Sequence, residues 1–176
     1  MSASPWIRLS TSQRNLLYDF SQTTIPTDNV DEEYLSSPRK WDIGNIFKFM
    51  VFIGPISSIF DYATYGMMLF VFNAWDNPSL FQTGWFVESL LTQTLIIHII
   101  RTAKVPFFES HASPALIATT VIICTIGMTL PFTWAGAALG FEPLPRLYWP
   151  LVASMLVTYA VLTHFVKVWF TRKWGL

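Results

Sequence analysis

The sequence predicts an all-α fold, a polytopic membrane protein with four transmembrane helices in an antiparallel bundle. Three observations predict it. Only 12% of the 176 residues are charged and 52% are hydrophobic, whereas soluble globular domains carry about 25% charged residues. Four apolar segments of membrane-spanning length follow one another along the chain. Basic residues gather beside alternate loops, a pattern typical of multi-pass membrane proteins.

Each of the four spans meets the length that a bilayer demands, about 20 mainly apolar residues. The first, "IFKFMVFIGPISSIFDYATYGMMLFVF" (46–72), is long enough to tilt or kink. The others are "GWFVESLLTQTLIIHII" (84–100), "ALIATTVIICTIGMTLP" (115–131) and "LYWPLVASMLVTYAVLTHFV" (147–166). The segments "NAWDNPS", "RTAKVPFFESHASP" and "EPLPR" separate them, and their turn-forming residues predict loops.

The basic residues predict the orientation of the bundle. One side of the predicted membrane has Arg39, Lys40, Lys48, Arg101, Lys104, Lys167, Arg172 and Lys173. The two loops on the other side contain only Arg146. The positive-inside rule therefore places both termini in the cytoplasm. This predicts a multi-pass protein of the cell membrane, either a plasma membrane or a bacterial inner membrane.

The tryptophans support the same arrangement, because indole rings favour the membrane–water interface. We expect four of them at the outer boundary: Trp75, Trp85, Trp134 and Trp149. Three others, Trp41, Trp169 and Trp174, are expected at the inner boundary.

Several classes of protein are excluded by composition. The 11 basic and 11 acidic residues balance, so there is no basic surface of the kind that binds nucleic acid. The single cysteine, Cys124, cannot form an intrachain disulfide. Residues 1–14 lack the apolar stretch of a secretory signal.

An unusual polar position lies inside the first span. Gly54-Pro55 is expected to break the helix, because proline lacks an amide donor and clashes with the preceding turn. Ser57 and Ser58 could then satisfy the freed backbone groups. Asp61 follows, and an intramembrane carboxylate needs a partner. Two interpretations remain open: Asp61 forms a hydrogen bond with a neighbouring helix, or it belongs to an ion path.

The second span has a polar sector. At about 100° per residue, Glu88, Ser89, Thr92 and Gln93 share one side of the helix. This side is expected to face protein or a wet cavity, because a charge that faces lipid is costly. Hydrogen bonding between helices and ligation of an ion both explain the pattern.

Before the first span, residues 15–19 read "NLLYD". On a helix, Asn15 and Asp19 share one face at a spacing of four residues. Each side chain offers oxygen, which hard cations such as Mg²⁺ and Ca²⁺ prefer. The pair alone is explained equally well by a solvated helix end.

The order of motifs resembles the C-terminal transmembrane part of P-type cation-transporting ATPases, especially the magnesium-transporting subgroup. The motifs are "NLLYD", "PRKWD" (38–42), "GPISSIFD" (54–61), "FQTGWFVESLLTQTLIIHIIRTAKVPF" (81–107), "LPF" (130–132) and "PLPRLYWP" (143–150). The resemblance extends from about Asn15 to Trp174.

The resemblance implies a division of the chain and a set of ion ligands. Residues 1–14 are a divergent segment, 15–45 are the end of a truncated transmembrane helix with a cytoplasmic loop, and 46–176 are a four-helix domain. Asn15 and Asp19 are implied as transport-site residues for Mg²⁺. Gln93 matches a ligand position of the eighth helix, and Glu88 is a weaker candidate. The residues of the first span themselves favour a structural part for Asp61 and Pro55.

The chain also departs from the family. It contains no Asp-Lys-Thr-Gly motif, which forms the aspartyl phosphate in these pumps. The nucleotide-binding, phosphorylation and actuator domains have no counterpart in this sequence, nor have the first five transmembrane helices. We therefore expect no catalytic residue, no bound cofactor and no ATP hydrolysis by the chain alone, although the family is ATP-driven.

Three functions compete. The first is a membrane-domain fragment of a magnesium-transporting P-type ATPase, whose partner is a separate chain with the ATPase domains and the first five helices. The second is a non-catalytic subunit that associates with a complete cation pump. The third is an independent carrier or channel, which is disfavoured because the spans have no continuous polar lining.

Overall fold

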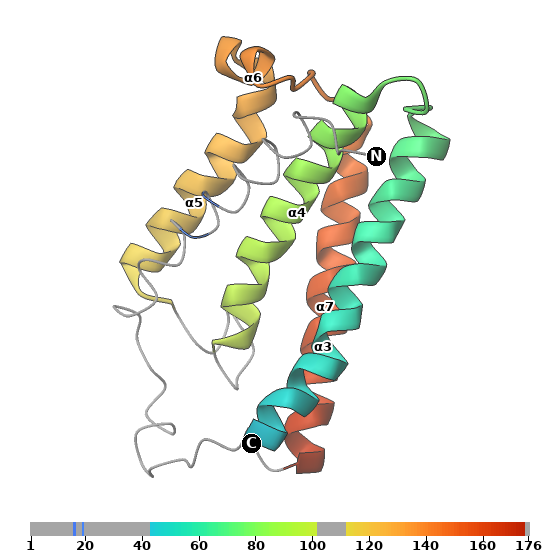
Figure 1. Ribbon diagram of the computed structural model, residues 1–176. Helices are drawn as coiled ribbons and strands as arrows, with labels where there is room; N and C mark the ends of the chain where they lie inside the picture. Colours follow the sequence, from blue (N-terminus) through green and yellow to red (C-terminus); the bar gives the residue numbers. More distant parts are fainter. Residues whose placement is uncertain (1–15, 17–18, 20–42, 102–111, 175–176) are drawn as a thin grey trace.

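The computed structural model describes residues 16, 19, 43–101 and 112–174, and all regular elements in these residues are helical. The elements are α3 (Ile43–Gly66), a π-helical extension η2 (Met67–Val71), α4 (Pro78–Ile100), α5 (Pro114–Thr129), a 3₁₀ turn η3 (Leu130–Phe132), α6 (Trp134–Ala138) and α7 (Tyr148–Trp174). Figure 1 shows the four long helices side by side, with alternating chain direction. The all-α antiparallel bundle is confirmed.

Local chemistry fixes where the helices begin. Asn77 caps α4, its side-chain oxygen accepting from the Leu80 amide at 3.1 Å. Ser113 caps α5 in the same way through Leu116, at 3.2 Å. Each cap is followed by proline at the first helical position, where the absent amide donor costs nothing. As a result, α4 begins six residues before the predicted second span.

Three described helices are long and apolar enough to cross a membrane: Pro78–Ile100, Pro114–Phe132 and Tyr148–Lys173. The predicted first span corresponds to α3, which has 24 residues and continues into η2. At about 1.5 Å per residue, α3 alone exceeds the roughly 30 Å of a hydrocarbon core. With α3 as the fourth, the bundle has four membrane-crossing helices.

The prediction that Gly54-Pro55 breaks the first span is wrong. Pro55 lies inside α3, which continues without interruption from Ile43 to Gly66. The proline removes one amide donor, but packing of the next two turns holds the helix. Phe60 lies edge-to-face against Tyr159 of α7, with ring centroids 5.2 Å apart. The Ser57 hydroxyl also forms a 3.0 Å hydrogen bond with the Tyr159 hydroxyl instead of replacing a backbone partner.

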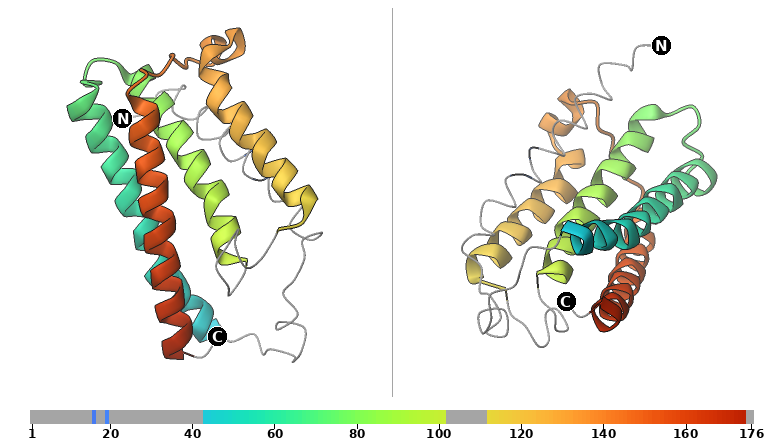
Figure 2. Two further views of the ribbon diagram at one scale, coloured as in Figure 1. Left: turned by 180° about the vertical axis from the view of Figure 1, so that it is seen from behind. Right: turned by 60° about the horizontal axis from the view of Figure 1, so that its bottom comes forward.

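The centre of the bundle is α4, which contacts α3, α5 and α7. In the apolar stretch of α4, 61% is buried inside the protein, whereas 22% is buried in the corresponding stretch of α5 and 22% in that of α7. Figure 2 shows α4 flanked by α5 on one side and by α3 and α7 on the other. Side chains of α4 are therefore the best placed to meet neighbouring helices, and most of α5 and α7 is free to face lipid.

Specific contacts hold the other helices to α4. Near one end, the Tyr148 hydroxyl of α7 donates to the Gly84 carbonyl at 2.7 Å. Near the other end, the Lys167 ammonium donates to the Ile99 carbonyl at 2.9 Å, which places a cation at the carboxyl end of α4. On the α5 side, Gly127 packs against Leu90, and a β-carbon there would overlap that leucine. A small residue at this position permits close helix packing, as is common in membranes.

Candidate functional site

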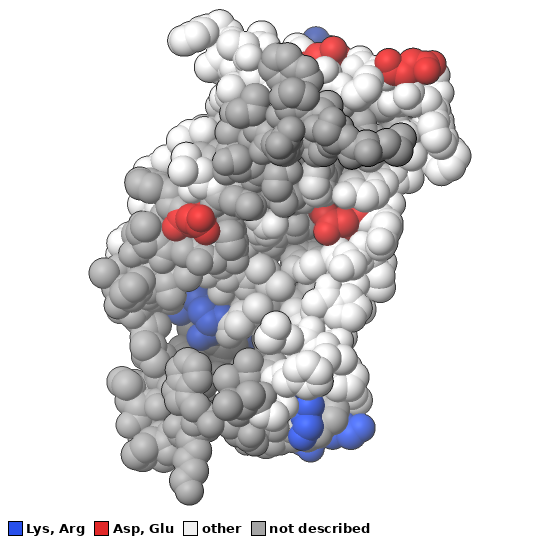
Figure 3. Space-filling model, in the orientation of Figure 1, with Lys and Arg blue, Asp and Glu red and all other residues white. Residues whose placement is uncertain are grey.

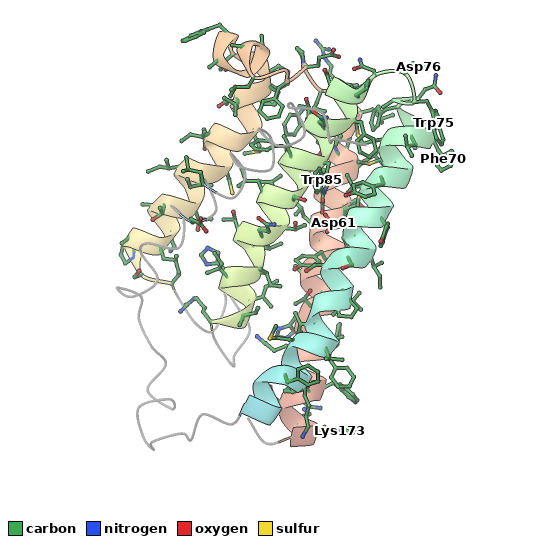
Figure 4. All side chains as sticks on the ribbon, in the orientation of Figure 1. Asp61, Phe70, Trp75, Asp76, Trp85 and Lys173 are labelled. Atoms are coloured by element: carbon green, nitrogen blue, oxygen red, sulfur yellow. The ribbon has the colours of Figure 1, made fainter. Side chains whose placement is uncertain are left out.

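Asp61 is held by two donors from α4. Its Oδ1 accepts from the Trp85 indole nitrogen and from the Ser89 hydroxyl, both at 3.1 Å. Figure 4 shows Asp61 and Trp85 facing each other between α3 and α4. The hydrogen bond to a neighbouring helix that the sequence suggested for Asp61 is therefore confirmed. The alternative role in an ion path stays a prediction.

The place of Trp85 at the outer membrane boundary stays a prediction. Because α4 begins at Pro78, Trp85 lies seven residues inside the helix, about 10 Å along its axis. Its indole nitrogen donates a hydrogen bond to the Asp61 carboxylate of α3. Trp75 and Trp134, in contrast, are 59% and 86% exposed, as expected for boundary residues.

The polar sector of the second span faces protein, as predicted. Glu88, Ser89 and Thr92 are 1%, 3% and 8% exposed. Ser89 donates to Asp61. The Thr92 hydroxyl lies within hydrogen-bond distance of two backbone carbonyls of its own helix, Glu88 at 3.0 Å and Ser89 at 3.1 Å. Of these three residues, Ser89 joins α4 to α3 through its hydrogen bond.

Gln93 is the fourth residue of this sector. Its Oε1 atom is buried, yet it has no hydrogen-bond partner among the described residues. Trp85, Ser89 and Gln93 follow at intervals of four residues, so they form one stripe along α4 with a rise of about 6 Å per step. Buried oxygens are normally hydrogen-bonded, and an exception calls for a cause. The oxygen of Gln93 is chemically suited to a hard cation.

The other predicted ligands are less defined. Asn15 lies outside the described residues, and Asp19 is helical with an exposed side chain. Within the described part of the chain, no three His, Cys, Asp or Glu side chains gather closely enough to hold a metal ion. Elsewhere on α4, the Nε2 atom of His98 lies 2.8 Å from the Thr120 hydroxyl of α5. The pairing of Asn15 with Asp19 stays a prediction.

The sequence matches known proteins over nearly its whole length. The family model described as "Cation transporting ATPase, C-terminus" matches residues 14–169. Among curated proteins, "Magnesium-transporting ATPase, P-type 1" of Salmonella typhimurium strain LT2 is 43% identical over 173 residues. A protein of the same name from Escherichia coli K12 is 45% identical over 173 residues. Each match covers 97% of this chain and 19% of the relative. The chain thus spans about a fifth of the length of these relatives.

Proposed function

The chain belongs to the cation-transporting ATPase family as a C-terminal membrane region, and from this premise we propose that it contributes part of the Mg²⁺ pathway of a pump. The ATP-hydrolysing domains and the remaining membrane helices of such a pump lie outside these 176 residues. The relatives are named magnesium-transporting ATPases, and the sequence of this chain has no aspartyl-phosphate motif.

One observation carries the proposal: the buried Gln93 Oε1 atom without a partner among the described residues. It lies on the central helix, one turn from the Asp61–Ser89 hydrogen bond. Mg²⁺ requires nearly octahedral oxygen coordination and releases its waters reluctantly. Gln93 alone cannot meet that requirement. Gln93, together with Asn15 and Asp19, would become a site only when oxygens from a second chain converge on them.

Purification from native membranes tests whether this chain associates with an ATP-hydrolysing polypeptide. We expect the tagged chain to copurify with a polypeptide that forms an acid-stable phosphoenzyme from ATP, and to form none itself, because that intermediate needs an activated carboxylate nucleophile. A partner that is inactive until this chain is added supports a split pump. A partner that pumps fully without it favours a regulatory subunit. Phosphoenzyme formation by the purified chain alone would overturn the proposal.

We further propose that both termini are cytoplasmic. Among the described residues, Lys48, Arg172 and Lys173 lie where α3 begins and α7 ends, whereas Asp76 and Glu142 lie in the loops at the opposite end. Figure 3 shows most of the blue surface in the lower half and two red patches at the upper end. This asymmetry agrees with the positive-inside rule.

Reporter fusions test the orientation. Fusions after Asn77 and Gly140 are expected to report the outside, and fusions after Ala103 and Leu176 the cytoplasm. The reason is that basic residues resist translocation. Alkaline phosphatase and green fluorescent protein, fused in parallel at each site, serve as reciprocal controls. A cytoplasmic signal after Asn77 would reverse the topology.

A further inference from the structure

A small polar pocket opens on the surface of α3 beside Asp61. Its volume is about 140 Å³, and it is lined by Ser58, Asp61, Tyr62 and Tyr65. Every lining residue has a side-chain oxygen. Asp61 uses Oδ1 for Trp85 and Ser89, and no hydrogen bond to its Oδ2 occurs among the described residues. The pocket therefore has a carboxylate oxygen available to a ligand.

Aromatic rings form the wall of this pocket. The rings of Tyr62 and Tyr65 stand perpendicular, with centroids 5.9 Å apart. Tyr65 in turn packs edge-to-face on Trp85 at 5.8 Å, which is the indole that holds Asp61. Aromatic faces attract ammonium and guanidinium groups. A carboxylate beside two tyrosines thus favours an organic cation as the ligand.

The pocket lies at mid-depth in the predicted bilayer. Helix α3 and its extension η2 end at Val71, and Asp61 precedes that end by ten residues, or about 15 Å, half of a typical hydrocarbon core. Trp75 and Phe70 lie at the outer end, well separated from Asp61 (Figure 4), and their rings are in contact. Beside the pocket, Ile59 and Tyr62 are 58% and 71% exposed. This face of α3 is uncovered by the described part of the chain.

No counter-charge for Asp61 comes from the described residues. Asp61 forms no ion pair with any of them, and the described lysines and arginines that flank α3 and α7 lie toward the helix ends. A carboxylate at mid-membrane that is only half-buried is costly unless it is paired. A free ion reaches such a site with difficulty through hydrocarbon. A cation carried on a membrane helix reaches it directly.

We propose that the pocket receives the lysine or arginine side chain of a transmembrane helix that belongs to another protein chain. The volume accommodates about four or five water-sized groups, enough for a cationic head and its last methylene. Charge pairing with Asp61 and contact with Tyr62 would then select that helix. The proposal requires only that α3 lies in the membrane, and it is independent of the proposed function.

Designed transmembrane peptides, used in place of the unidentified partner helix, test whether the pocket binds a lysine side chain. The full chain, with a donor fluorophore on its C-terminal tag, is placed in phosphatidylcholine vesicles with an acceptor-labelled polyleucine peptide that has one central lysine. A matched peptide has norleucine at that position. We expect the lysine peptide to associate about tenfold more tightly, as measured by energy transfer, which corresponds to about 1.4 kcal/mol and lies within the range of polar contacts between membrane helices. A peptide with its lysine near one end should lose the preference.

Substitutions in the chain show whether the pocket residues cause the preference for the lysine peptide. Asp61→Asn retains an acceptor for Trp85 and Ser89, so the fold is kept, but the lysine preference should vanish. Tyr62→Leu changes an exposed ring and should reduce it severalfold. Asp76→Asn, which removes an exposed loop carboxylate, is the matched control and should behave as wild type. Equal association of the two peptides with wild type, or an unchanged preference in Asp61→Asn or Tyr62→Leu, overturns the proposal. No Mg²⁺, ATP or pump is present, so the outcome is separate from that of the proposed function.

Discussion

Asp61→Ala is expected to have a free energy of unfolding in detergent about 2 kcal/mol below that of Asp61→Asn, and to accumulate less in membranes than that variant. The alanine removes the acceptor for two donors of the central helix, the Trp85 indole and the Ser89 hydroxyl. Both donors would be left without a partner between α3 and α4. Donors that lose their acceptor in a dry interface cost more than the average hydrogen bond contributes.

A second effect acts in the opposite direction and must be separated from the first. Asp61→Ala also removes a charge from the membrane interior, which is favourable by about 2.5–3.5 kcal/mol on insertion scales. Asp61→Asn removes the same charge but keeps the side-chain oxygen acceptor. The comparison of Asp61→Ala with Asp61→Asn therefore isolates the two hydrogen bonds, and we expect Asp61→Asn to be the more stable of the two by about 2 kcal/mol.

Denaturant unfolding in one detergent, followed by far-ultraviolet circular dichroism, measures this order. Asp76→Ala is the control, because Asp76 is an exposed carboxylate in the loop before α4 and should unfold like wild type. Equal stability of Asp61→Ala and Asp61→Asn would show that the two hydrogen bonds contribute nothing to the fold.

Much of this fold could be predicted from the sequence, because lipid imposes a strong rule on it. Backbone groups in hydrocarbon must be satisfied within a helix, so length and hydropathy identify α4, α5 and α7. The positions of the helix ends were predicted less accurately. Pro78 looked like part of a loop, but after the Asn77 cap it begins a helix. Pro55 looked like a break, but tertiary packing against Tyr159 overrides its local effect.

The site was harder to predict, because a single sequence shows spacing along one helix and not contacts between helices. The periodicity of the second span indicated that Glu88 and Ser89 face protein, and they do. It could not show that Trp85 reaches Asp61, since that contact joins residues 24 positions apart on different helices. The pocket residues Ser58 and Tyr65 had a signal that was missed: they lie three and four residues from Asp61, on the same face of α3.

The second large effect concerns Mg²⁺. The chain alone should show no Mg²⁺-dependent change in melting temperature, because its oxygen ligands are too few for octahedral coordination. The chain assembled with the proposed ATP-hydrolysing part should be stabilised, by about 2.7 kcal/mol when Mg²⁺ is at one hundred times its dissociation constant. This difference arises because binding to the folded assembly shifts the unfolding equilibrium.

Two substitutions in this chain should abolish most of that stabilisation. Asp19→Asn removes the charge of a predicted ligand. Gln93→Leu removes an oxygen that is buried but has no partner among the described residues, so it should leave the isolated chain as stable as wild type, or slightly more stable. Asp76→Asn is the control in both states.

The most direct test of the account is therefore the melting temperature of Gln93→Leu, with and without Mg²⁺, alone and in the assembly. The account predicts an unchanged melting temperature for the isolated variant and a lost Mg²⁺ response in the assembly. If the assembled variant gains as much stability from Mg²⁺ as wild type does, Gln93 is not a ligand and the proposed contribution of this chain to the Mg²⁺ site is wrong.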